Sequence, residues 1–115
     1  MNATIWHHAR CSKSRQTLAI LEEKNADITI RHYQKDPPSR AELAEAINTL
    51  GIAPKELVRT GDKAFKDLHL DTSAFGDHQW LELLASHPAL IQRPIVFTAR
   101  GAAIGRPPES VLEIL

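Results

Sequence analysis

Two short segments near the N-terminus and two near the C-terminus carry the apolar residues expected of strands, and residues 28–33 also alternate between apolar and polar positions. Residues 3–7, 28–33 and 94–98 are rich in β-branched and aromatic side chains, and each run has the length of a strand. Residues 102–104 follow a tight turn at 99–101, so they are expected to return antiparallel to the preceding strand. The pattern therefore predicts four strands, two on each side of a long middle region.

After the first strand, the apolar residues recur at the spacing of a helix. From Arg15 onward, Leu18, Ile20 and Leu21 fall on one apolar face, and Asn25 is expected to end the helix. The predicted second strand follows directly.

The middle of the chain shows helical spacing throughout. Ser39 and Glu42 have the spacing of a capping box, so a helix is expected to begin there and to end at Gly51. Short helical pieces are expected over residues 54–68, and another helix over 77–86. The apolar face of that second helix is predicted to contain Trp80, Leu81 and Leu84.

These elements together predict an α/β fold with a mixed four-stranded sheet flanked by helices and an all-helical insertion at roughly 39–90. A last helix is expected to open near Pro107 and Pro108, because proline is tolerated in a first turn. It should run through Val111, Leu112 and Leu115. A chain of 115 residues buries roughly two-thirds of its unfolded surface, so residues 1–115 are expected to form one domain.

Composition narrows the class of protein. Fourteen basic and fourteen acidic residues cancel, which argues against a nucleic-acid or membrane-surface binder. No apolar run approaches the roughly 20 residues that a membrane span needs, and the N-terminus lacks the pattern of a signal peptide. One cysteine permits no internal disulfide, which suits a reducing compartment. A cytoplasmic protein is expected, and a monomer.

Cys11 lies where the first strand passes into a helix, so free backbone N–H groups and the helix dipole should point at its sulfur. No acidic residue precedes Glu22, and a reactive thiolate is therefore predicted. The alternative is a small buried hydrophobic side chain. His7 either acts on the thiol or stabilises the turn, and both interpretations stay open. The neighbouring cations and hydroxyl donors are Arg10, Lys13, Arg15, Ser12 and Ser14.

The spacing around Cys11 argues against three other cysteine chemistries. A cysteine-phosphatase loop would need five residues before an arginine, but Arg15 follows after three. A dithiol redox centre would need a cysteine where Ser14 stands. The six histidines are scattered, so no metal site is expected. Monothiol chemistry remains, with a resolving thiol supplied by another molecule.

Three arginines stand at the edges of apolar elements and directly before turn-forming residues: Arg59, Arg93 and Arg106. Guanidinium groups bind oxyanions through paired N–H donors, so together they are candidates to hold an oxyanion beside a thiolate. Any one of them alone is better explained as a solvated surface charge.

Five segments resemble the glutaredoxin-dependent arsenate reductase family in register over nearly the whole chain. In one-letter code they are HHARCSKSR at 7–15, HY at 32–33 before PPSR at 37–40, LVR at 57–59, HPALIQRPIV at 87–96, and the stretch from GRP at 105–107 to Leu115. The resemblance implies a thioredoxin-like (glutaredoxin-like) fold with a helical insertion.

The resemblance also implies a mechanism. Cys11 would attack arsenate and expel water, glutathione would form a mixed thiol adduct, and glutaredoxin would complete the reduction to arsenite. Glutathione would be a co-substrate, with no bound cofactor. The family's oxyanion-binding arginines fall on Arg59, Arg93 and Arg106, and its histidine falls on His7. The bond between Arg93 and Pro94 is expected to be cis. Ser12, Ser14 and Arg15 would support the thiolate loop.

One departure and two alternative functions accompany this resemblance. The chain has His8 and Ala9 where the family often has Asn-Pro, which would alter the stiffness of the loop and access to the thiol. A glutathione-dependent thiol reductase with another substrate is one alternative. A regulator resembling the Spx group, which binds RNA polymerase, is the other. Ser14 argues against a disulfide switch of that kind, and the retained arginines favour oxyanion chemistry.

Overall fold

A computed structural model describes residues 1–115 and divides the chain into two compact units. The first unit joins residues 1–36 to residues 93–115, and the second consists of residues 37–92. Each unit has its own architecture and is described by itself.

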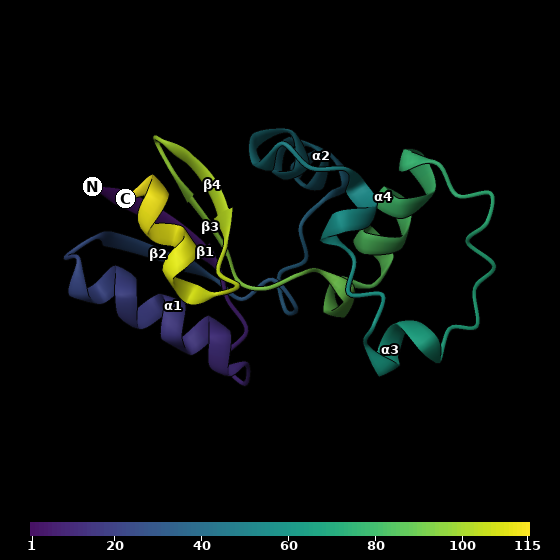
Figure 1. Cartoon of the computed structure of the whole chain (residues 1–115), viewed down its shortest axis with the longest axis horizontal. Coiled ribbons are helices and arrows are strands. Elements are labelled where there is room, and N and C mark those ends of the chain that lie inside the picture. Colours follow the sequence, from purple (N-terminus) through teal and green to yellow (C-terminus); the bar gives the residue numbers. More distant parts are fainter. The chain divides into compact units, whose positions relative to one another are not determined.

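The first unit is a four-stranded sheet with helices (Figure 1). Its strand order is β2-β1-β3-β4, with β1 parallel to β2 and antiparallel to β3, and with β4 antiparallel to β3. The predicted α/β class and mixed four-stranded sheet are confirmed. In chain order the elements are β1 (Asn2–Trp6), α1 (Ser12–Glu23), β2 (Asp27–Arg31), β3 (Ile95–Thr98), β4 (Gly101–Ile104) and the 3₁₀ helix η3 (Pro108–Ile114).

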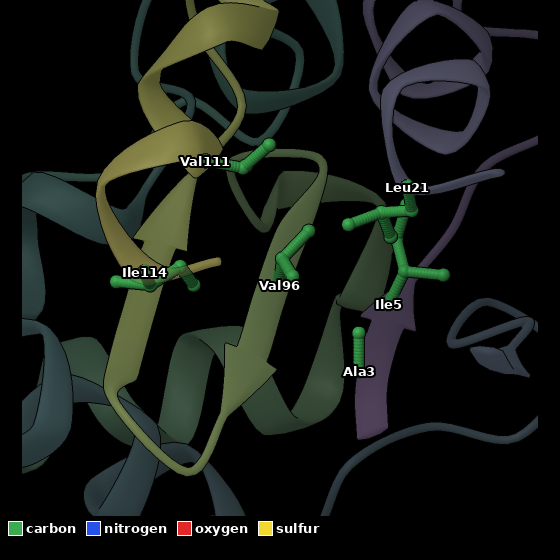
Figure 2. Close-up of a cluster of buried hydrophobic side chains, with 6 residues drawn as sticks. All are labelled: Ala3, Ile5, Leu21, Val96, Val111 and Ile114. Atoms are coloured by element: carbon green, nitrogen blue, oxygen red, sulfur yellow. The ribbon is translucent and has the colours of Figure 1, made fainter. Parts of the chain in front are cut away.

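One face of this sheet carries the core of the first unit (Figure 2). Successive strand residues point to opposite faces, so β1 contributes Ala3 and Ile5, and its register places Val96 of β3 beside Ile5. Helices α1 and η3 pack against each other over this face. The buried core residues are Ala3, Ile5, Leu21, Val96, Val111 and Ile114.

The parallel pairing of β1 and β2 places the beginnings of the two loops that follow these strands side by side. Trp6, the last residue of β1, lies opposite Arg31, the last residue of β2. The N–H of His7 then donates to the Arg31 carbonyl at 2.8 Å. The loop that leads to Cys11 and the loop that follows β2 therefore leave the sheet at the same edge.

The second unit is helical and contains one isolated bridge, between Val58 and Ile91. The predicted capping box is present: the N–H of Glu42 donates to Ser39 Oγ at 3.1 Å, and the N–H of Ser39 donates to the Glu42 carboxylate at 2.9 Å. Gly51 ends the helix in the left-handed conformation, with φ of 69°. The elements are α2 (Arg40–Leu50), η1 (Pro54–Leu57), α3 (Lys63–Lys66), α4 (Asp77–Ser86) and η2 (Pro88–Leu90).

The start of the first helix and the type of the last helix differ from the sequence prediction. Helix α1 begins at Ser12, three residues before the predicted start, because Cys11 is extended at φ −90° and ψ 123° and serves as the N-cap. The final helix is a 3₁₀ helix, whose three-residue repeat places Pro108, Val111 and Ile114 on one buried face.

The geometry of helices η3 and α4 decides which of their leucine side chains are buried. Leu112 is 43% exposed, because the three-residue repeat of η3 turns it away from the buried face. In α4, Leu83 joins Trp80 and Leu84 in the core in place of Leu81, because positions three and four residues apart share one helix face. No helix of the structure is both long enough and apolar enough to cross a membrane.

Candidate active site

Cys11 is the N-cap of α1, and its half-buried thiol is free. The first turn of α1 has no acidic residue, and no side chain caps it. The backbone carbonyl of Cys11 accepts the first helical hydrogen bond, from the N–H of Arg15 at 3.0 Å. Because no side chain caps the first turn, its N–H groups have no partner within the helix and lie close to the sulfur of the N-cap residue.

The surroundings of Cys11 lower the pKa of its thiol. Burial acts in the opposite direction and raises the pKa, but it is outweighed. The lowering comes from the backbone N–H of Ser14, the Arg93 guanidinium, the backbone N–H of Lys13 and the charge of Arg106, in that order of size. All four favour the thiolate, which is the nucleophilic form of cysteine.

Two of the three predicted oxyanion-binding arginines meet at this sulfur. Arg106 Nη2 donates to Cys11 Sγ at 3.5 Å, and Arg106 Nε donates to the Arg93 carbonyl at 2.7 Å. Arg93 also donates to the thiol from its side chain. The bonds Arg93–Pro94 and Arg106–Pro107 are both cis, and the first of these agrees with the expectation from the family. A thiolate beside two guanidinium groups is an arrangement that can bind an oxyanion and attack its central atom.

Gly105 lets the two arginine segments approach α1 closely. Its N–H donates to the Pro94 carbonyl at 2.9 Å. A Cβ atom at this position would lie 2.4 Å from Thr17 Oγ1 and 2.8 Å from Pro94 Cγ. Only glycine fits there without displacing the Thr17 side chain or the Pro94 ring.

His7 is 5% exposed and belongs to a polar network behind the thiol. Its Nδ1 lies 2.6 Å from Ser14 Oγ, which also accepts the N–H of His8 at 3.1 Å. Burial lowers the pKa of His7 first, and the charges of His32, His8 and Arg15 lower it further. This network fits a neutral His7 whose Nδ1 accepts a hydrogen bond from the Ser14 hydroxyl. A catalytic role for His7 remains a prediction.

The other predicted residues lie in different surroundings. Arg15 Nη1 donates to the Ala9 carbonyl at 2.9 Å, so it braces the loop before Cys11, whereas Ser12 is exposed. Arg59 belongs to the second unit, where its side chain pairs with Asp62 at 3.2 Å and its N–H donates to the Leu90 carbonyl. Its oxyanion-binding role remains a prediction.

A pocket that was not predicted from the sequence lies next to the loop that leads to Cys11. The pocket, of about 460 Å³, is lined by residues 7–10 after β1 and by His32, Gln34 and Lys35 after β2. The parallel order of the first two strands was the available signal, since loops that follow parallel strands lie at one sheet edge. Across the structure, no group of three or more histidine, cysteine or acidic side chains is arranged to bind a metal ion.

Comparison with known proteins places this site in a family. The ArsC family model matches residues 6–114. An arsenate reductase of Haemophilus influenzae is 42% identical over 116 residues and covers 100% of both chains. An arsenate reductase of Escherichia coli K12 is 40% identical over 99% of this chain and 81% of its own length. The solved structure of an arsenate reductase from Vibrio cholerae superposes with a TM-score of 0.94 at 40% identity, over 100% of this chain and 98% of the other. The chain therefore belongs to the ArsC family and has its thioredoxin-like fold.

Proposed function

We propose that this protein is an arsenate reductase, an oxidoreductase that converts arsenate to arsenite through Cys11. The observation that carries the proposal is the contact of Arg106 with the Cys11 sulfur, in a site where Arg93 also favours the thiolate. The same two cations can neutralise a bound arsenate, which repels a thiolate in their absence. The relatives that are about 40% identical over the whole chain are named arsenate reductases, which supports this substrate.

The first step forms a bond between Cys11 Sγ and arsenic. One arsenic–oxygen bond breaks, and the oxygen leaves as water after taking up protons, while arsenic stays pentavalent. Arg93 and Arg106 stabilise the charge on the remaining oxygens.

Reduction then requires two external thiols. Glutathione displaces a second oxygen as water, so arsenic carries the Cys11 and glutathione sulfurs. A glutaredoxin thiol attacks the glutathione sulfur, and the electron pair of the sulfur–arsenic bond passes to arsenic, which becomes trivalent. Water releases arsenite from Cys11, and a second glutathione regenerates glutaredoxin. The net reaction converts arsenate and two glutathione molecules to arsenite, glutathione disulfide and water.

Around this reaction we propose a cytoplasmic monomer that needs no prosthetic cofactor. A single cysteine and a dependence on glutathione both suit a compartment in which thiols are kept reduced. His7 and Ser14 would hold the loop that presents the thiol, and Arg15 would brace that loop through Ala9.

The test is arsenate reduction with glutathione, glutaredoxin, glutathione reductase and NADPH, with Cys11→Ser as the matched variant. Turnover in the wild type and none in Cys11→Ser is expected. A wild type that fails to reduce arsenate, while Cys11 is alkylated rapidly at neutral pH, would contradict arsenate as the substrate and favour another substrate for a thiol reductase. Capture of RNA polymerase by an inactive wild type would favour a regulator instead.

A further inference from the structure

We propose that the pocket at the carboxyl ends of β1 and β2 binds glutathione through its carboxylates and presents its thiol to the arsenic on Cys11. This inference rests on the proposed function, since it identifies where the second substrate of that reaction binds. The pocket's volume of about 460 Å³ lies within the range of about 300–1,000 Å³ that small-ligand sites usually have.

The position of the pocket is one at which α/β sheets commonly bind ligands. Its two walls are the loops that follow two adjacent parallel strands, and ligands of open α/β sheets bind outside the carboxyl ends of such strands. The walls are held together by the hydrogen bond from the N–H of His7 to the Arg31 carbonyl. On the second wall, the N–H of Lys35 donates to the His32 carbonyl at 2.9 Å, so the loop closes into a turn.

The charge of the pocket suits an anion with two carboxylates. Its lining contains two permanent cations, Arg10 and Lys35, both exposed, and no acidic side chain. The acidic residue next along the chain, Asp36, is paired with Arg31 at 3.3 Å. Glutathione has a carboxylate near each end, an ammonium group beside one of them and its thiol in the middle, so one cation on each wall of the pocket matches its two carboxylates.

The pocket also lies beside the nucleophile. Arg10 directly precedes Cys11, and the N–H of Cys11 donates to the carbonyl of His8, another lining residue, at 3.0 Å. The pocket wall and the reacting cysteine are therefore parts of one tight turn. Because Arg10 and Cys11 are adjacent in this turn, we expect the central thiol of a ligand held by Arg10 to reach an arsenic atom on the Cys11 sulfur.

The chain has separate cations for its two anionic substrates. Arg93 and Arg106 favour the Cys11 thiolate and are assigned to arsenate, and neither belongs to the pocket lining. Arg10 and Lys35 are left for the second anion. This separation predicts that the affinities for arsenate and glutathione can be changed independently.

The binding test uses S-methylglutathione, which keeps both carboxylates but has no free thiol. Titration into the wild-type protein, followed by calorimetry and by the NMR signals of His8 and His32, should show binding that shifts both histidines. The double variant Arg10→Gln/Lys35→Gln should bind about tenfold more weakly, because it loses two exposed charge pairs with the ligand. The matched control is Lys24→Gln, an exposed lysine at the C-terminal end of α1, which should bind as the wild type does.

The kinetic test separates the two substrates. In the arsenate assay the double variant should raise the KM for glutathione about tenfold and leave the KM for arsenate within twofold. Equal binding of S-methylglutathione by the double variant and the wild type would overturn the proposal, as would an equal loss in Lys24→Gln. A change confined to the KM for glutaredoxin would also overturn it. If the wild type shows no arsenate turnover but the binding results hold, the proposed function fails and the glutathione site stands.

Discussion

Helices α1 and α2 both begin after a residue with extended backbone, but different groups satisfy their first turns. Before α2, Ser39 and Glu42 close the turn with two reciprocal hydrogen bonds. Before α1, Cys11 has a similar backbone conformation, yet no side chain caps the turn and no acid lies in it. In α2, side chains of the helix itself accept the N–H groups of the first turn. In α1, the corresponding N–H groups have no such acceptor and are left to stabilise a thiolate.

The two starts also differ in what holds them in place. The start of α2 relies on its own side chains, whereas the start of α1 relies on neighbouring segments. Arg15 holds the loop through Ala9, Ser14 bonds to His7, and Gly105 packs against Thr17. The reactive start of α1 therefore has no side-chain cap of its own and depends on tertiary contacts.

The largest expected effect is on arsenate turnover and comes from removing the cation that contacts Cys11 at the start of α1. Arg106→Ala should lower arsenate turnover about 100-fold, because it removes a donor beside the developing negative charge. It should also raise the pKa of Cys11, measured by the pH dependence of alkylation. The control is Arg100→Ala, on the exposed turn of the β3–β4 hairpin, which should retain turnover within twofold. A similar loss in both variants would show that general charge, and not the site, is responsible.

The next effect tests the dependence of α1 on its neighbours. Gly105→Ala should lower the free energy of unfolding by about 2 kcal/mol, because the added Cβ would meet Thr17 at 2.4 Å and Pro94 at 2.8 Å. Gly61→Ala is the matched control in the second unit, since a Cβ there meets nothing within 4 Å. Urea denaturation of both variants measures the difference. Equal stabilities would mean that the packing behind α1 adapts freely.

Changing the cap residue of each helix probes the difference between the two helix starts. Ser39→Ala should cost about 1 kcal/mol of unfolding free energy, because α2 loses the side-chain acceptor for the N–H of Glu42. Cys11→Ser should instead increase stability by about 0.5 kcal/mol, because serine is a favoured N-cap residue, although activity is lost. Urea denaturation checks both. A destabilised Cys11→Ser protein would show that the thiol itself stabilises α1 at that pH.

The smallest effect is a pH dependence with a defined sign. The folded pKa of Cys11 lies below its ordinary value of 9.0, so the unfolded chain binds more protons between these two values. The stability of the wild type relative to Cys11→Ser should therefore rise as pH increases toward 9.0, and this gain should be lost as pH falls through the folded pKa. Denaturation of both proteins across this range measures it. The difference between Ser39→Ala and the wild type should stay constant over the same range, and a constant Cys11→Ser difference would contradict the lowered pKa.

Much of this structure followed from local sequence patterns. The capping box at Ser39, the glycine stop at Gly51 and the helix over 77–86 depend on neighbouring residues, and all three are as predicted. The exposure of Leu112 was not predicted, because a 3₁₀ helix and an α-helix share similar sequence signals but turn different residues inward.

The sequence by itself determined the order of elements, the electropositive setting of the only cysteine and the family to which the chain belongs. The tertiary structure decided which distant residues meet Cys11. Arg106 is 95 positions away along the chain, and only the pairing of β1 with β3 and the close approach at Gly105 bring its segment to the sulfur. The pocket beside the thiol was likewise set by the parallel pairing of β1 with β2. The physical reason is that strand pairing joins residues irrespective of their separation in sequence, whereas caps and helical faces depend on neighbours a few positions apart.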